Sequence, residues 1–414
     1  MERISTNLTN NDMQYYMRKQ EVGMNTVGNK IGSQKRILSL RDDPVGAAHS
    51  TRYQSLITRL NQFSDNVSFV KGNNAMAGTY VQDCIDTLQR VRELAIQGAS
   101  DTYSRDDKKK IAVEIDELLN HMVQIANANE GDVSLFSGDK KFGKAFRVIK
   151  GRVPGAAGQR VTGVEYIGTT KKNMSEISEA SYISNNFAGN EIFWSENQQV
   201  FSTRDAGKYQ VQENSEISID GNIIKLKAGD NIHAVIAKIN DSKAPVKAHI
   251  DPVRNSLILE TTEPHQLWME DIGGKTVLQD LGILSENTSR PPYNVAIDAN
   301  LAGGSMFDMV IYLRDKLYDG DVFEIGGSGI RGIDNALDSL LTSVADIGAK
   351  DQRLDFVFAR LSNEELNMQQ RNSREVDLDV AEAMMNYKKL ELTHNASLRF
   401  AARVLQPTLL DFLR

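Results

Sequence analysis

Cysteine is almost absent from this sequence of 414 residues, which contains only Cys84. A disulfide within the chain is therefore excluded, and the fold has to be stabilised by packing alone. Cys84 falls on an apolar heptad position, where a thiol usually behaves as a small hydrophobic side chain rather than as a nucleophile.

Long apolar runs are also missing. No stretch of 18 or more apolar residues occurs, so no membrane insertion is expected. The N-terminus, MERISTNLTNNDMQYYMRKQ, lacks the basic-then-apolar order of a cleavable signal peptide. The net charge of −7 gives no indication of nucleic acid or an anionic membrane as a partner. We expect a chain that is either cytoplasmic or exported by a route that reads an uncleaved, polar N-terminus.

The residue patterns of metal sites and catalytic centres do not occur either. The six histidines are scattered, no two are four residues apart, and neither H-E-x-x-H nor C-x-x-C is present. G-x-S-x-G is absent, and Asp377 and Asp379 are spaced so that a helix would point them apart. We therefore predict no catalytic residues, no metal ligands and no cofactor, and interpret the chain as a protein that is not an enzyme.

One glycine motif could bind a nucleotide. GSGIRG places Gly327, Gly329 and Gly332 in the pattern G-x-G-x-x-G, after a strand-like VFEI and with Asp351 about twenty residues later. A dinucleotide-binding unit also needs a parallel strand after a short helix, whereas a long heptad-patterned segment follows here. We interpret the motif as a flexible loop that re-enters a helical bundle, and a nucleotide-binding enzyme stays as an alternative.

What the sequence does contain is a long heptad pattern near the N-terminus. Asp43 can act as an N-cap and Pro44 suits the first helical position, so together they mark a helix start. From Tyr53 to Ala95 the apolar positions alternate by three and four. These signals predict one helix from Pro44 to about Gly98, roughly 80 Å long at 1.5 Å per residue.

The same rhythm returns after a short loop and again near the C-terminus. Ser104 and Asp107 resemble a capping box that starts a second helix, and similar spacing runs from Leu337 to Leu361 and from Val380 to the end of the chain. These stripes predict a helical bundle. Its predicted core consists of Leu56, Leu60, Phe63, Val67, Val70, Leu88, Val91, Ile115, Leu118, Leu354, Phe358 and Leu361.

The middle of the chain has the signals of strands. FRVIKGRVPGAAGQRVTGVEYIG resembles a strand, a turn and a strand, and EISIDGNIIKL predicts a hairpin that turns at Asp220-Gly221. GDNIHAVIAKIN predicts a short helix capped by Asp230, and VKAHIDPVRNSLILETTE a second hairpin. The order is that of a ββαββ unit.

The fold class that follows is mainly α. The N- and C-terminal parts form a long antiparallel coiled coil or helical bundle, into which a β-rich α+β domain is inserted. We expect terminal helical segments at 1–43 and 375–414, a bundle domain at 44–137 and 321–374, and the inserted domain at 138–320.

Both chain ends carry apolar stripes that one chain is not expected to bury. Six apolar residues in the tail VLQPTLLDFL contribute on the order of 10 kcal/mol when buried, against on the order of 40–80 kcal/mol for ordering forty residues. Such ends order when neighbouring copies bury them together, which predicts a polymer. A cytosolic coiled-coil regulator is the alternative. The predicted assembly interface consists of Ile4, Leu8, Tyr15, Val22, Ile31, Leu398, Leu405, Leu409, Leu410 and Phe412.

Several stretches resemble the flagellin family. They are MERIST, KRILSLRDDPVGAA, RVRELAIQGASDTYSRDDKKKIAVEIDELLNHMVQIAN and SLFSGDK at the N-terminal end, and DIGAKDQRLDF and DLDVAEAMMNYKKLELTHNASLRFAARVLQPTLLDFL at the C-terminal end. Residues 213–283 are similar to an insert motif of the same family. SLFSGDK and DKLYDGDVFEIGGSGIRGIDNALDSL look most like its hook-associated junction members.

The resemblance implies a structural subunit of the bacterial flagellum that connects hook and filament. It implies export of the unfolded chain by the flagellar type III system, with an export chaperone and without signal-peptide cleavage. Polymerisation through the terminal helices would then form a ring of copies of this chain, next to another hook-associated protein and flagellin. The expected location is the flagellum, extracellular or periplasmic, and flagellin or another axial flagellar protein is the alternative. On the same resemblance, Asp43-Pro44 separates the innermost terminal segment from the long helix.

Overall fold

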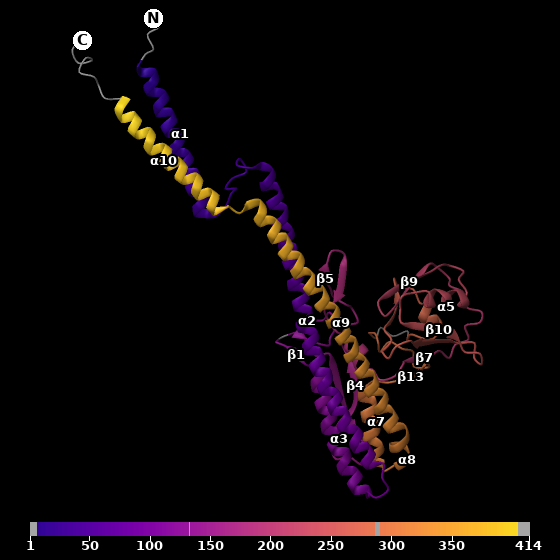
Figure 1. The fold of residues 1–414 in the computed structure, drawn as a ribbon. Helices are drawn as coiled ribbons and strands as arrows, with labels where there is room; N and C mark the ends of the chain where they lie inside the picture. Colours follow the sequence, from indigo (N-terminus) through magenta and orange to yellow (C-terminus); the bar gives the residue numbers. More distant parts are fainter. Residues whose placement is uncertain (1–5, 132, 286–289, 405–414) are drawn as a thin grey trace, which may run out of the picture. The chain divides into compact units, whose positions relative to one another are not determined.

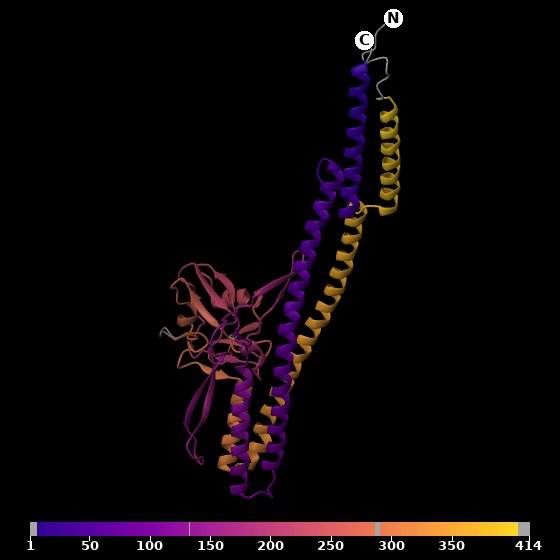
Figure 2. The ribbon, with the colours of Figure 1, turned by 90° about the vertical axis from the view of Figure 1, so that its left-hand side faces the viewer.

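The computed structural model describes residues 6–131, 133–285 and 290–404, and the chain divides into two compact units. The terminal unit comprises Met1–Asp65 and Val357–Arg414, and the central unit comprises Asn66–Phe356. Helices α2 (Pro44–Gly98) and α9 (Ile330–Val376) each contribute residues to both. The mainly α fold with a β-rich insertion is confirmed (Figures 1 and 2).

Helix α2 starts as its sequence predicts. It runs from Pro44 to Gly98, and the Asp43 Oδ1 atom accepts the Gly46 N–H at 3.0 Å. Proline at the first helical position loses no hydrogen bond, because its N–H would have no partner there. Both predicted ends of the helix are confirmed.

In the terminal unit, α1 (Thr6–Ser33) and α10 (Val380–Val404) lie side by side (Figures 1 and 2). A Cβ at Gly23 would lie 3.7 Å from a Leu390 methyl group, and one at Gly28 would lie 3.8 Å from the Tyr387 ring. The Gln20 side chain donates to Ser397 Oγ at 3.3 Å. Small residues thus allow the two helices to approach; that the termini order only on assembly stays a prediction.

The central unit contains a helical bundle in which α3 (Arg105–Ala126) packs against α7 (Met306–Asp319). Ser104 caps α3 by accepting the Asp107 N–H at 3.2 Å. The Asp107 carboxylate accepts a hydrogen bond at 2.7 Å from the Ser104 hydroxyl, not from the Ser104 N–H as in a full capping box. The full capping box belongs to α7, between Ser305 and Asp308. Helix α7 lies within the range 138–320 that was assigned to the β-rich insertion, but it packs against α3 of the bundle. The second part of the bundle therefore begins before the predicted boundary at 320.

The glycine motif GSGIRG is helical. Helix α8 (Val322–Glu324) leads into a π-helical turn at Ile325–Gly329, which continues directly into α9. Neither the strand expected at VFEI nor the expected loop forms. Asp321 explains the difference, because its carboxylate caps α8 by accepting the Glu324 N–H at 3.2 Å and so starts helical structure before the glycines.

Three antiparallel hairpins accompany the bundle, and the second of them was predicted. Their strands are β1 (Asn129–Glu130) with β2 (Val133–Ser134), β3 (Phe146–Arg152) with β4 (Gln159–Tyr166), and β5 (Met174–Ser178) with β6 (Ser181–Ser184). The β5–β6 region is fastened to α2, where Asn66 donates to the Glu176 carbonyl at 2.8 Å and Asn73 to the Asn185 carbonyl at 2.9 Å. The short helix α4 (Gly189–Ile192) follows.

The inserted β-rich part contains two sheets. The first has the strand order β10-β11-β7-β13 and the second the order β12-β8-β9. The strands are β7 (Gln199–Phe201), β8 (Ser215–Ile219), β9 (Asn222–Leu226), β10 (Val246–Ile250), β11 (Leu257–Thr261), β12 (Met269–Ile272) and β13 (Asn300–Ala302), and α5 (Ile232–Asn240) and α6 (Val277–Asp280) lie between them in the chain. Both predicted hairpins are confirmed, although their strands belong to different sheets.

Two local predictions in this part have different outcomes. Asp220 (φ 49°) and Gly221 (φ 77°) form the turn between β8 and β9, with the positive φ angles of a tight hairpin. The helix cap was assigned to the wrong residue: Asn231 caps α5 by accepting the Ala234 N–H at 2.9 Å. Asp230 instead accepts the Lys227 N–H at 2.7 Å and pairs with Lys238.

The central unit has two hydrophobic cores. The bundle core is formed by α2, α3, α7, α9 and the β3–β4 hairpin, and the insert core by the two sheets with α5 and α6. Three rings tie the hairpin to the bundle: the Phe146 centroid lies 5.6 Å from that of Phe193 and 5.3 Å from that of Phe307. These edge-on contacts add to the burial of the rings themselves.

A fully buried arginine crosses the bundle core. Arg314 of α7 is 0% exposed, and its Nη1 atom donates to Asp116 of α3 and to the Val161 carbonyl of β4, each at 2.7 Å. Asp116 also accepts a hydrogen bond from Arg160 at 2.9 Å. Asp315 accepts hydrogen bonds from the Nε and Nη2 atoms of Arg314. Such a network fixes how three elements meet, because each missing partner would leave a buried charge.

Replacing Asp116 by alanine should therefore destabilise the central unit by about 3–5 kcal/mol, because Arg314 would lose its buried carboxylate. The matched control is Asp334→Ala, which breaks the exposed pair with Arg92 and should cost less than about 1 kcal/mol. Urea unfolding followed by the fluorescence of Trp194 and Trp268 measures both. Equal losses for the two variants would contradict the role given to the buried network.

Candidate assembly surface of the terminal helices

The paired helices α1 and α10 expose apolar side chains that their mutual contact does not cover. Tyr15, Tyr16 and Val22 of α1 are each more than 60% exposed, as are Leu392 and Phe400 of α10. Exposed apolar side chains that occur singly need no explanation, but a group of large ones on one helix pair indicates a contact surface.

An apolar groove runs between the two helices. It has a volume of about 540 Å³. Its lining residues are Asp12, Met13, Tyr16 and Met17 of α1 and Thr393, Ala396, Ser397 and Phe400 of α10. Methionine and aromatic side chains can adapt to an inserted apolar group. We refer to these eight residues as the terminal groove.

The predicted assembly residues lie partly on this surface. Tyr15, Val22 and Leu398 are exposed, whereas Ile31 is half-buried. Leu8 belongs to α1, but its side chain is outside the described residues. Also outside them are Ile4, Leu405, Leu409, Leu410 and Phe412, and with them the proline at 407.

The residues of the terminal groove themselves were missed. The prediction followed one heptad stripe, which includes Tyr15. The groove is lined instead by Tyr16 and Met17, together with Phe400. The run QYYM contained a signal, since two adjacent aromatic residues on a helix cannot both lie on one narrow stripe.

A loop next to the helix pair is fixed by backbone and charged contacts. The Arg36 N–H donates to the Val376 carbonyl at 2.7 Å, and the Leu378 N–H to the Gln34 carbonyl at 3.0 Å. The Arg36 guanidinium also donates to the Glu375 carbonyl at 2.6 Å and to Asp43 at 3.0 Å. The loop after α1 is thereby tied to the short connection between α9 and α10, within the terminal unit.

Two aspartates stabilise the same loop. Asp42 accepts the Leu38 and Ser39 N–H groups at 2.9 and 3.1 Å, and these bonds lower its pKa. The pKa of Asp43 is lowered by the Gly46 N–H and by Arg36. Both carboxylates are therefore stabilised in the charged form, and Asp43 serves the helix start and the loop at once.

The predicted bundle core is mostly buried. Leu56, Leu60 and Leu118 are half-buried, whereas Phe358 is 41% exposed and is not a core residue. Along α9 the inner face passes through Leu354, Val357 and Leu361, so that Phe358 points away from it. The buried residues of the prediction are Phe63, Val67, Val70, Leu88, Val91, Ile115, Leu354 and Leu361.

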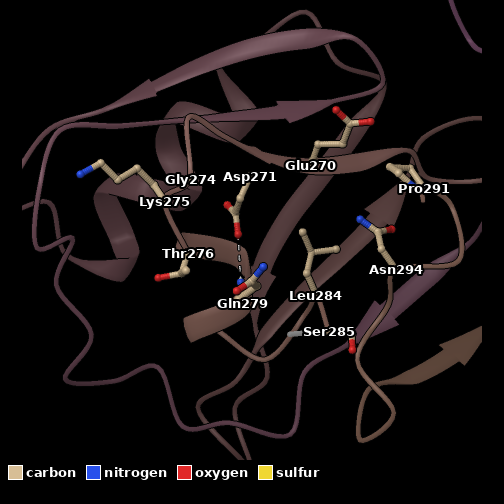
Figure 3. Close-up of a pocket in the computed structure, with 10 residues that line it drawn as sticks. All are labelled: Glu270, Asp271, Gly274, Lys275, Thr276, Gln279, Leu284, Ser285, Pro291 and Asn294. Atoms are coloured by element: carbon tan, nitrogen blue, oxygen red, sulfur yellow. Dashed lines mark hydrogen bonds between the residues drawn. The ribbon is translucent and has the colours of Figure 1, made fainter. Parts of the chain in front are cut away.

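A second hollow lies in the inserted part and has a volume of about 350 Å³ (Figure 3). Asp271 lies in it, and burial raises the pKa of this carboxyl to about 6. Its oxygens accept the Leu278 N–H at 3.1 Å and the Gln279 N–H at 3.2 Å. Asp271 thus stabilises the start of α6, which accounts for its position without any catalytic role.

Other kinds of site were sought within the described residues. There, no group of three or more histidine, cysteine, aspartate or glutamate side chains is placed to hold a metal ion. None of the helices in that part of the chain is both long and apolar enough to cross a membrane.

Three family models match this chain. The bacterial flagellin N-terminal helical region matches residues 4–141, the bacterial flagellin C-terminal helical region matches 330–413, and the flagellin hook IN motif matches 213–263. The two helical regions describe the two ends of one family and together match more than half of the chain. The hook IN motif lies within the predicted range 213–283.

Known proteins are similar over nearly the whole chain or over a shorter stretch of it. Polar flagellin C of Vibrio parahaemolyticus is 24% identical over 97% of this chain and 96% of its own length. Flagellin FlaB1 of Treponema pallidum is 38% identical over 24% of this chain and 35% of its own length. A crystal structure of flagellar hook associated protein-3 from Legionella pneumophila, 15% identical, aligns with a TM-score of 0.47 over 78% of this chain and 98% of its own.

The matched regions coincide with elements described above. The N-terminal region contains α1, α2 and α3, the C-terminal region contains α9 and α10, and the IN motif contains the β8–β9 hairpin, α5, β10 and β11. The resemblance that the residues suggested is confirmed in all three places. The chain belongs to the flagellin family, a family of structural proteins of the bacterial flagellum and not of enzymes.

Proposed function

We propose that this chain is the junction subunit that connects the flagellar hook to the filament. The observation that carries the proposal is the terminal helix pair, which leaves large apolar side chains and the terminal groove open to a neighbouring subunit. A subunit at a junction has to bind copies of itself and two different neighbours. SLFSGDK and the stretch around GSGIRG, which resemble junction members of the family, support this position over that of a filament subunit.

Export and assembly are part of the proposal. The unfolded chain passes through the flagellar type III system with its chaperone, is not cleaved, and then forms a ring next to another hook-associated protein and flagellin. The absence of any disulfide within the chain supports passage in the unfolded state, because no covalent link has to be broken. In the ring, neighbouring copies bury the terminal grooves, which offsets the conformational entropy lost by the chain ends.

A filament subunit is the second candidate, since the flagellin of Vibrio parahaemolyticus aligns over nearly the whole chain. The two candidates differ in where the protein lies and in how many copies each flagellum holds. A junction subunit occupies one short zone, whereas a filament subunit covers the full length of the filament.

Immunogold labelling of purified flagella distinguishes the two positions. We expect gold particles only at the boundary of hook and filament, and expect a strain without this chain to keep its hooks while losing attached filaments. Restoring the full-length chain is the control. Labelling along the whole filament would assign the chain to the filament and overturn the junction proposal.

The terminal groove offers a sharper test of assembly. Phe400→Ser removes a side chain that is 64% exposed, so the free energy of unfolding should change by less than about 0.5 kcal/mol. Incorporation into flagella should fall severely, because the neighbouring subunit loses an apolar anchor. Quantitative blots of purified flagella and of the culture medium measure incorporation and export separately.

The matched control is Val253→Ser, which alters an 86% exposed apolar side chain in the inserted part. It should be exported and incorporated like the natural chain. Normal incorporation of Phe400→Ser would show that the groove is not part of the assembly contact.

A further inference from the structure

One short segment of the central unit, residues 263–268, contributes to both of its cores. Leu267 is 2% exposed and belongs to the insert core. The next residue, Trp268, packs against the bundle core. Consecutive side chains of an extended segment point in opposite directions, so this segment can contribute to both cores at once.

Backbone hydrogen bonds hold the segment on both sides. Toward the bundle, Gln266 and Asn190 exchange two bonds at 3.2 Å, from the Gln266 N–H to the Asn190 carbonyl and from the Asn190 side chain to the Gln266 carbonyl. Toward the insert, the Asp220 N–H donates to the Trp268 carbonyl at 2.8 Å, and the Trp268 N–H donates to Asp220 Oδ1 at 2.9 Å. Asp220 in the β8–β9 turn therefore sets the position of Trp268.

A buried histidine completes this arrangement. His265 is 5% exposed; its Nδ1 atom lies 2.8 Å from the Glu263 carbonyl oxygen, and its Nε2 atom lies 3.0 Å from Asp220 Oδ2. A carbonyl oxygen and a carboxylate oxygen only accept hydrogen bonds. Both ring nitrogens must then carry a proton, and only the charged imidazolium ion satisfies the two contacts together.

We propose that His265 is a pH-sensitive lock that fastens the inserted β-rich part to the helical bundle through Asp220. While His265 is charged, it holds Asp220, and Asp220 holds Trp268 against the bundle core. When the ring loses one proton, one of its nitrogens presents a lone pair to an oxygen, and that contact becomes repulsive.

The charged groups around the ring agree with this assignment. Burial lowers the pKa of His265. The hydrogen bond and the charge of Asp220, the Glu263 carbonyl and the charge of Glu191 on α4 together outweigh burial, so the pKa is raised above its ordinary value. A pKa that is raised in the folded chain gives a stabilisation that is complete below about pH 6.5. The stabilisation is lost as pH rises through the raised value.

The test compares the natural full-length chain with Asp220→Asn. Asparagine tolerates the positive φ of this turn position and can still accept the Trp268 N–H. Its amide donates to Nε2, so a neutral ring protonated on Nδ1 keeps both contacts. We expect the pKa of His265 to fall by about one unit or more in this variant, a tenfold weaker proton affinity.

Proton NMR titration of the histidine rings measures this value, and His265→Gln identifies the resonance by its disappearance. Trp268 emission and the unfolding temperature are followed over the same range, from about pH 5.5 to about pH 9. In the natural chain, rising pH should shift the emission to the red and lower the unfolding temperature. His265→Gln should lose that dependence, whereas His249→Gln, which changes an exposed histidine of the inserted part, should keep it.

Three results would overturn the lock. One is a His265 midpoint at or below pH 6.5 in the natural chain. Another is an unchanged midpoint in Asp220→Asn. The third is a pH dependence of Trp268 emission that persists in His265→Gln. Because none of these measurements needs flagellar assembly, they test the lock separately from the proposed junction function.

Discussion

The burial of apolar surface is the constraint on which the terminal unit depends. A helix that pairs with one partner covers one stripe of its surface, yet α1 and α10 each carry more apolar residues than one stripe holds. Their contact leaves Tyr16 and Phe400 lining an open groove. In the part of the chain that the structure describes, the groove between the two helices stays open. On the proposed assembly, the free energy of burying it would come from contact with another subunit. Membership of a polymer-forming family agrees with a surface of this kind.

The central unit differs from the terminal unit, because it buries charged side chains in its interior. Arg314 is surrounded by Asp116, Asp315 and a backbone carbonyl, and His265 lies between Asp220 and another carbonyl. Buried charges are expensive unless each is paired, so these contacts permit few alternative arrangements. These contacts tie helices, hairpins and insert to one another within the central unit.

Features that depend on residues close together in the sequence could be predicted, whereas contacts between residues far apart in the sequence could not. Helix α2 was predictable to its ends because Asp43, Pro44 and the three-four spacing act within a few residues of one another, and Asp220-Gly221 fixed its hairpin in the same way. Helix α7 was missed, although Ser305 and Asp308 signal its start, because fourteen residues are too few for a heptad pattern to stand out. The run QYYM signalled that Tyr16 lies off the stripe of Tyr15, but its pairing with Phe400 could not be predicted, since the two residues come from opposite chain ends. His265 and Asp220 are 45 residues apart, and no spacing rule connects them.

The apolar terminal groove and the contact of His265 with Asp220 respond to different conditions. The proposed assembly of subunits and the proposed fastening of the insert can therefore be separated. Apolar burial depends on temperature and solvent but involves no proton, so the contact proposed for the terminal groove is expected not to vary with pH in the physiological range. The contact of His265 with Asp220 depends on one proton, because a neutral ring cannot donate to both of its oxygen partners. On the proposed lock, a change in pH would loosen the inserted part from the bundle and leave the apolar contacts proposed for the chain ends in place. On these two proposals together, the subunit would keep its place in a polymer while its insert responds to pH.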